Sequence, residues 1–154
     1  MSRTYSSYLP QPSAPQAQGS PMGAVLQQIA ALKQTIEKDP RNVEALTQLG
    51  TMYMEAGKFP QAIDYFQRAL AVRDDAQVRT DLGICYRNNN EPEKSLAEFQ
   101  TIVRQNPQEW QALFNEVIIL AELKRTAEAK AELAKLQALR PGDAEVARLA
   151  ASVR

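Results

Sequence analysis

The sequence predicts an all-α protein built as a stack of antiparallel helix pairs. From Met22 onwards, apolar residues recur three and four positions apart, which is the spacing of one helix face. No segment of useful length alternates with period two, so no strands are expected. The motif Leu-Gly-x-x-Tyr also occurs twice, at Leu49–Tyr53 and at Leu82–Tyr86, thirty-three residues apart. A repeat of this length is typical of stacked helical units.

Length, charge and composition indicate a single domain without a nucleic-acid partner or a membrane span. The 154 residues are the size of one domain, and 44% of them are hydrophobic. Eighteen basic side chains balance eighteen acidic ones. There is therefore no overall field to attract nucleic acid, and no nucleic-acid partner is expected. No stretch approaches the about 20 apolar residues of a membrane-spanning helix, so no membrane span is expected in this chain.

The residues that carry most enzyme chemistry are missing or scattered. The chain has no histidine and a single cysteine, Cys85, which disfavours metal sites and most hydrolytic mechanisms. There is no glycine-rich phosphate loop, and the carboxylates lie on separate helical faces rather than in a paired setting. We therefore predict no enzyme activity, no catalytic or metal-binding residue and no cofactor. Cys85 is expected to be a buried, inert thiol, and a reactive nucleophile is the alternative.

Residues 1–21 differ in composition from the rest of the chain. They hold four of the nine prolines together with Ser and Gln, and almost no aliphatic side chain. Such a segment cannot bury enough apolar surface to offset the entropy of ordering, so we predict a disordered leader. An inert linker is the favoured interpretation, and a short adhesive segment of Tyr5, Tyr8 and Leu9 is the alternative. A leader of this kind would also follow a lost membrane anchor.

Eight helices are expected from the helical periodicity and from the residues that interrupt it. Short polar residues suited to N-caps precede several of them, at Asn42, Asp75, Asn106 and Asp143. Pro60 and Pro92 stand where a first helical turn tolerates the missing N–H. The expected spans are 23–38, 43–56, 60–72, 76–89, 92–105, 108–123, 126–139 and 143–152.

Further residues keep step with the repeat. The spacing Ala62-x-x-x-Phe66 returns as Ser95-x-x-x-Phe99 and as Ala129-x-x-x-Leu133, while the units end at Pro40, Asp74, Pro107 and Pro141. Over residues 43–142 the pattern resembles the tetratricopeptide repeat, in which W-x₂-L-G-x₂-Y, A-x₃-F and a closing proline recur in about 34 residues. The resemblance implies a right-handed superhelix, or solenoid. It has about three units, at 43–75, 76–109 and 110–142, with capping helices at 22–39 and 143–154.

Close packing of two helices accounts for the small residues in this pattern. Gly50 and Gly83 let the two helices of a pair approach each other, and Ala62, Ser95 and Ala129 play the same part from the second helix. The space between pairs is then expected to be filled by Tyr53, Phe66, Tyr86 and Phe99.

The second and third repeats depart from the pattern. Arg79 occupies a slot in which the other units place Leu46 and Leu113, and Asp74 replaces a closing proline. We therefore expect the second unit to join the first less regularly. In the third unit, Glu116-Val117 stands where Leu-Gly is expected and Leu120 replaces the tyrosine, so its second helix carries most of the resemblance.

The family resemblance implies a function in protein binding. In such stacks the first helices of the pairs line a concave surface that receives extended or helical peptides. We predict a non-catalytic adaptor or assembly factor for a protein or peptide partner. One alternative is that Phe114 and Ile118 are simply core residues and Arg87 only a solvated charge. The residues expected to face the groove are Thr47, Thr51, Met54, Thr80, Ile84, Arg87, Asn88, Phe114, Ile118 and Ala121.

One further function of the family is not expected here, and another is the alternative to peptide binding. The carboxylate clamp with which some family members grip chaperone C-termini is not expected, because Thr47 and Thr51 replace its lysine and asparagine and Asp81 would repel a carboxylate. Self-assembly into a homo-oligomer through the end helices is the alternative function, with Leu26, Ile29, Val146 and Leu149 as the contact residues. The layout is similar to that of short bacterial repeat proteins. We expect a cytoplasmic location, or a membrane-tethered or periplasmic one if an anchor preceded the leader.

Overall fold

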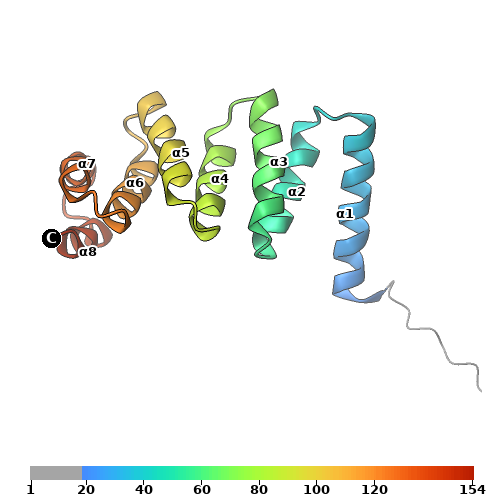
Figure 1. Ribbon diagram of the computed structural model, residues 1–154, viewed down its shortest axis with the longest axis horizontal. Coiled ribbons are helices and arrows are strands. Elements are labelled where there is room, and N and C mark those ends of the chain that lie inside the picture. The colour runs from blue at the N-terminus through green and yellow to red at the C-terminus, as the bar shows by residue number, and fades with distance from the viewer. Residues whose placement is uncertain (1–18) are drawn as a thin grey trace, which may run out of the picture.

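The computed structural model describes residues 19–154, and within them the chain is entirely helical (Figure 1). This confirms the all-α fold. The leader residues Tyr5, Tyr8 and Leu9 lie outside the described part of the chain. The helices are α1 (Pro21–Lys38), α2 (Val43–Glu55), α3 (Phe59–Val72), α4 (Ala76–Asn88), α5 (Pro92–Gln105), α6 (Trp110–Glu122), α7 (Thr126–Leu139) and α8 (Ala144–Ser152).

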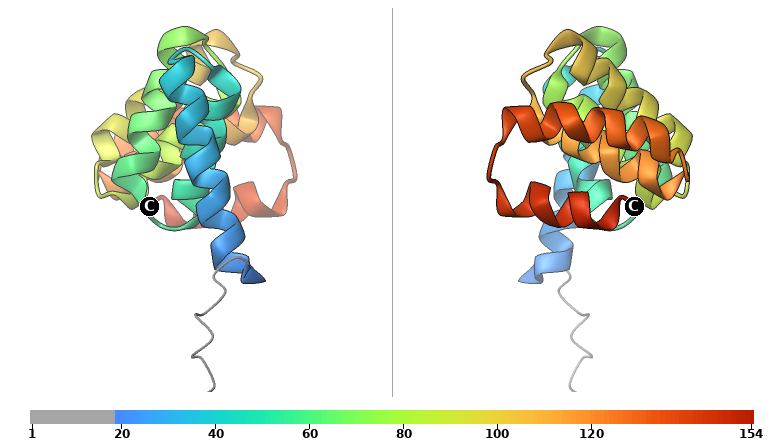
Figure 2. Two further views of the ribbon diagram at one scale, coloured as in Figure 1. Left: turned by 90° about the vertical axis from the view of Figure 1, so that its right-hand side faces the viewer. Right: turned by 90° about the vertical axis from the view of Figure 1, so that its left-hand side faces the viewer.

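The helices form a single row of antiparallel pairs. The closest packing is within the pairs α2–α3, α4–α5 and α6–α7, and each pair then packs against the next. The helices α1 and α8 stand at the two ends of the row (Figure 1). The view along the row shows the successive pairs rotated relative to one another (Figure 2). The arrangement is the predicted solenoid of about three helix pairs with an additional helix at each end.

Side-chain caps set the starts of three helices as expected. Asn42 Oδ1 accepts a hydrogen bond from the Ala45 N–H at 2.9 Å, and Asp75 and Asp143 cap α4 and α8 in the same way. The prediction for Asn106 was wrong, because α6 begins only at Trp110. Asn106 is instead the C-cap of α5, and its Oδ1 accepts from the Gln108 N–H at 3.2 Å. It therefore closes the turn between the helices, and α6 starts later than predicted.

The turn inside each helix pair has the same backbone conformation. Gly57, Asn90 and Lys124 occupy equivalent repeat positions and all adopt a positive φ, of 71°, 61° and 61°. The residue after each of them donates its N–H back into the preceding helix, as from Lys58 to the Tyr53 carbonyl at 2.8 Å. This is the arrangement that satisfies the last carbonyls of a helix. Glycine adopts it without strain, but the lysine does not.

Close helix packing within the pairs depends on small residues, as predicted. A Cβ atom added to Gly50 would lie 2.5 Å from Phe66 Cε1, and one added to Gly83 would lie 2.8 Å from Phe99 Cε2. Ser95, on α5, is buried and its hydroxyl donates to the Gly83 carbonyl at 2.6 Å. The aromatic rings of the second helices therefore lie directly on the glycines of the first.

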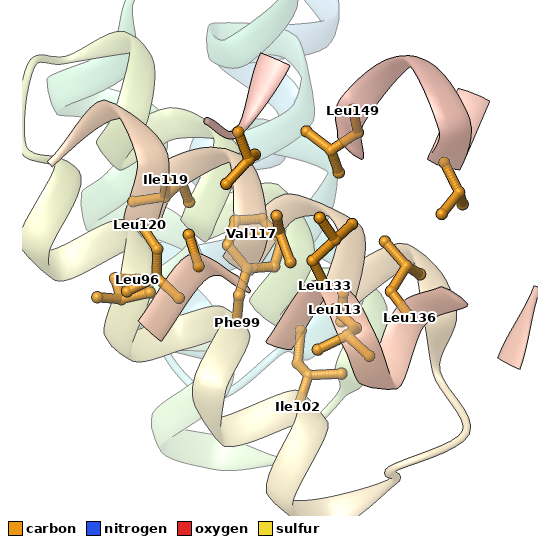
Figure 3. Packing of buried hydrophobic residues seen from close by; sticks show 14 residues of the cluster. Leu96, Phe99, Ile102, Leu113, Val117, Ile119, Leu120, Leu133, Leu136 and Leu149 are labelled. Atoms are coloured by element: carbon orange, nitrogen blue, oxygen red, sulfur yellow. The ribbon is translucent and has the colours of Figure 1, made fainter. Parts of the chain in front are cut away.

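The core consists of two apolar clusters along the row. One gathers side chains of α1 to α4 around Phe66, and the other gathers side chains of α5 to α8 around Phe99. Figure 3 shows the second cluster, in which leucines of α5, α6 and α7 converge. No single layer of side chains runs the length of the molecule, which is typical of a repeat protein in which each unit packs only on its neighbours.

The two departures in the second repeat compensate each other. The Arg79 guanidinium donates to Asp74 Oδ1 and to Glu98 Oε2, both at 2.7 Å, and Asp74 also accepts from Gln105 at 2.8 Å. The hydrogen bond from Arg79 lowers the pKa of Asp74. The arginine that replaces a large apolar residue thus binds the aspartate that replaces the closing proline. These ion pairs add to the apolar packing of α3 against α4 at the junction of the first two repeats.

The departure in the third repeat places a carboxyl group in the core. Glu116 is only 5% exposed, and its Oε2 has no hydrogen-bond partner. Burial, with the nearby Glu132 carboxylate, raises the pKa of Glu116. Leu120 is buried at the place of the repeat tyrosine. The third unit therefore packs as a repeat while it carries one unfavourably buried acid.

Candidate functional site

The predicted groove residues all lie on the first helices of the three pairs. We call the surface that they form on α2, α4 and α6 the first-helix face. None of the ten belongs to the buried core. Ile84, Arg87 and Asn88 are exposed, and the half-buried members are Thr47, Thr51, Met54, Thr80, Phe114, Ile118 and Ala121. The face is therefore accessible along the described pairs.

The part of this face on α2 and α4 carries three threonines, but their hydroxyl protons are mostly used in hydrogen bonds. Thr51 donates to the Thr47 carbonyl at 3.0 Å and Thr80 to the Ala76 carbonyl at 2.8 Å, each within its own helix. The Thr47 hydroxyl is buried without a hydrogen-bond partner. The threonines can thus offer mainly acceptor lone pairs to a bound chain.

A bidentate ion pair bridges the face between the second and third repeats. The Arg87 guanidinium donates through Nε to Glu122 Oε2 at 3.1 Å and through Nη2 to Glu122 Oε1. This hydrogen bonding raises the pKa of Arg87. Because both side chains are more than 40% exposed, the pair contributes little to stability. The pair does orient the arginine, so Arg87 is not simply the solvated charge that the sequence left as an alternative.

The α6 end of the face is apolar. Phe114, Ile118 and Ala121 are half-buried and pack in part against the second core cluster. The Phe114 ring meets Trp110 edge to face, with 6.5 Å between the ring centroids. The Arg140 guanidinium lies over the Trp110 ring, 4.4 Å from its centroid. These contacts fix the orientation of Phe114.

A hollow beside Phe114 extends the face onto the last helix. It has a volume of about 520 Å³ and is lined by Phe114 and by four residues of α8. The α8 residues are Glu145, Arg148, Leu149 and Ser152. The sequence interpretation did not include them. The repeat spacing could have found them, because Arg148 and Ser152 follow Phe114 and Ile118 by thirty-four residues.

Asp81 and Cys85, both on α4, are not placed as reactive groups. Asp81 is half-buried and accepts a hydrogen bond from Gln77 at 3.2 Å, and burial raises its pKa. Cys85 is buried, and that burial, with the Asp81 carboxylate nearby, raises the pKa of the thiol to about 11. A thiol with this pKa forms almost no thiolate near neutral pH and is a poor nucleophile.

The described part of the chain holds neither a cluster of metal-ligating side chains nor a helix suited to span a membrane. No group of three or more His, Cys, Asp or Glu side chains within residues 19–154 could hold a metal ion. No helix over the same residues has both the length and the apolar character needed to cross a membrane.

Solved structures share this fold. MamA superimposes with a TM-score of 0.74 at 22% identity, covering 83% of this chain and 75% of that one. A tetratricopeptide repeat protein from Parabacteroides merdae gives a TM-score of 0.78 at 22% identity, with 86% and 53% covered. YrrB, a TPR protein with an unusual peptide-binding site, gives 0.73 at 22% identity, with 84% and 67% covered. At these identities the likeness concerns the fold.

The sequence itself matches a family model. No curated protein matches the chain. The model of the tetratricopeptide repeat matches residues 17–79 and, in a second match, residues 53–113. Together these matches span well over half of the chain. The protein therefore belongs to the tetratricopeptide repeat family.

Proposed function

We propose that this protein is a non-catalytic adaptor that binds a peptide segment of another protein along the first-helix face. The observation that carries the proposal is the apolar side chain of Ile84 on α4, which is 36% exposed, together with the half-buried Phe114 and Ile118 on α6 of the same face. Large apolar side chains left in contact with solvent on a row of rigid helices are typical of a surface that a partner covers.

The neighbouring polar groups fit the recognition of a peptide. The hollow beside Phe114 offers space for one apolar side chain of the partner, and Glu145 and Arg148 at its edge offer an acceptor and donors for the adjoining main chain. The Arg87–Glu122 pair holds its guanidinium in one orientation before binding. Since these groups lie on packed helices, binding costs mainly the ordering of the partner.

Affinity purification of the tagged full chain, followed by mass spectrometry, tests this proposal. The variants are Ile84→Asp and Phe114→Ala, and the matched control is Ala97→Asp on the exposed side of α5. We expect both face variants to lower recovery of a specific partner at least about tenfold, because loss of a buried anchor costs more than about 1.4 kcal/mol. The control should recover the partner as the unaltered protein does.

Folding must be checked for each variant, because Phe114 also packs against the core. Circular dichroism and the melting temperature serve for this purpose. If the two face variants remain folded and still recover the same partners in the same amounts, the first-helix face is not the binding surface.

A further inference from the structure

The first helix carries a continuous apolar stripe. Met22, Val25, Ile29, Leu32 and Ile36 follow one another at alternating intervals of three and four residues, which places them along one side of α1. Such a stripe is buried over its whole length when a helix packs in a two-helix contact.

Only the C-terminal half of this stripe is covered by the protein's own fold. Ile36 is buried, and Ile29 and Leu32 are partly buried in the first core cluster. In the N-terminal half, Met22 is 68% exposed and Val25 is 42% exposed, and the adjoining Leu26 is 60% exposed. These three side chains define what we call the α1 patch.

Helix length explains why the patch is uncovered. The helix α1 has 18 residues and its neighbour α2 has 13. At 1.5 Å per residue, the five additional residues are about 7.5 Å of helix. The N-terminal end of α1 accordingly projects past the ends of α2 and α3 in both viewing directions (Figures 1 and 2).

We propose that the α1 patch is covered by the same patch of a second copy of this chain, in a two-fold symmetric dimer. The charge distribution favours a second copy. From Gly19 to Leu32 there is no ionisable side chain, and the first charge of α1 is Lys33. Two copies of the patch can therefore meet without like-charge repulsion and without desolvating a charge.

The distribution of exposed apolar residues favours the two-fold contact over head-to-tail stacking. Stacking requires a different, complementary surface at the opposite end of the row. The expectation that Val146 and Leu149 supply it was wrong, because α8 turns both into the second core cluster, where they are 2% and 8% exposed. Within residues 19–154, the large exposed apolar side chains are the α1 patch and Ile84.

Ile84 is a poorer match for the patch than the patch itself. It lies one helical turn from Arg87 and Asp81, so a helix seated there would have to desolvate charged groups. The α1–α1 contact leaves the first-helix face of both copies free. The dimer would then present two binding faces, and a partner with two binding segments would gain avidity.

Sedimentation velocity and light scattering of the full chain across roughly 1–100 μM protein test the proposal. We expect the mass to approach twice the 17.1 kDa of one chain and to stop there. Leu26→Glu should raise the dissociation constant at least about tenfold, because it removes two apolar side chains from the contact and adds two carboxylates. Circular dichroism should be unchanged, since Leu26 is exposed in one chain.

Two controls make the result specific. Gln27→Glu adds the same charge to the side of α1 opposite the stripe, and Ile84→Glu adds it to the first-helix face. Both should dimerise as the unaltered chain does. A monomer at all concentrations overturns the proposal, as does a mass that grows beyond two chains or dimerisation that Ile84→Glu abolishes. The oligomeric state is measured without a partner, so this result and the outcome of the affinity experiment can be distinguished.

Discussion

Replacement of Gly50 by alanine tests whether close helix contact, rather than helix propensity, determines this position. A Cβ atom at Gly50 would lie 2.5 Å from Phe66 Cε1, 2.6 Å from Cδ1 and 3.0 Å from Cζ. Favourable carbon contacts lie at about 3.5–4.0 Å. The Phe66 ring is fully buried and cannot swing aside into solvent. The helices α2 and α3 must therefore separate, or the ring must leave its rotamer.

Two opposing effects set the size of the change. Alanine in the middle of a helix is favoured over glycine by about 1 kcal/mol. Overpacking of a well-filled core costs about 1–3 kcal/mol, and a contact a full ångström too short belongs at the upper end of that range. We expect Gly50→Ala to lower the free energy of unfolding by about 2 kcal/mol. For Gly83→Ala, where the shortest contact with Phe99 is 2.8 Å, we expect a loss of about 1 kcal/mol.

Urea titration followed by far-ultraviolet circular dichroism measures these changes. With a slope of about 2 kcal/mol per molar urea, the midpoint for Gly50→Ala should fall by about 1 M. Gly19→Ala is the control, since no atom lies within 4 Å of its added Cβ. Phe66→Leu should partly rescue Gly50→Ala, because leucine lacks the ring atoms that the Cβ meets. A stabilised Gly50→Ala, or an absence of rescue, would refute the reasoning.

Two further substitutions should stabilise the protein. Lys124→Gly should raise the free energy of unfolding by about 1 kcal/mol in urea titration, because Lys124 is exposed and has a φ of 61°. Asn90→Gly should raise it less, because asparagine tolerates this conformation. Equal effects of the two substitutions would contradict this explanation. Glu116→Gln should stabilise the protein at pH 7. Folding raises the pKa of Glu116, so the folded protein keeps the proton on this carboxyl group to a higher pH than the unfolded chain does. The free energy of unfolding of the unaltered protein should therefore fall as the pH rises above about 4.5. Urea titrations at several pH values should show a smaller fall in the free energy of unfolding for Glu116→Gln than for the unaltered protein. If this free energy depends on pH in the same way for both proteins, Glu116 does not titrate as described.

Features that depend on local periodicity could be predicted from the sequence. The helix pairs, the close approach of helices at Gly50 and Gly83, and the buried thiol of Cys85 all follow from the position of a residue in the repeat. The contact partners were not predicted, because the rings of Phe66 and Phe99 were expected between pairs and lie on the glycines within a pair. The start of α6 could not be predicted in this way. Asn106 is as good an N-cap by type as Asn42, but it can serve only one of the two helices it separates, and the fold assigns it to α5.

The repeat spacing indicated on which helices the candidate site residues lie, but not how their side chains pair. Repeat spacing put all ten residues on α2, α4 and α6 and outside the core, but it carried no information on which polar groups were already bonded. Arg87 binds Glu122, thirty-five residues away, because one full repeat and one further residue bring them to facing sides of adjacent first helices. That contact depends on the rotamers of two long side chains, which a repeat pattern does not determine.

The same pairing principle explains how irregular repeats remain in one stack. Arg79 and Asp74 each break the repeat pattern, and each alone would weaken the junction between the first two units: the arginine by placing a charge among apolar groups, the aspartate by removing the proline that ends a helix. Together with Glu98 they form a hydrogen-bonded set that binds both Nη atoms of the partly buried guanidinium, while its Nε is left without a partner. Because the energetic cost of the first departure depends on the presence of the second, the two cannot be judged separately against the family pattern. A residue that departs from a repeat is best interpreted together with the residue it contacts in the neighbouring unit.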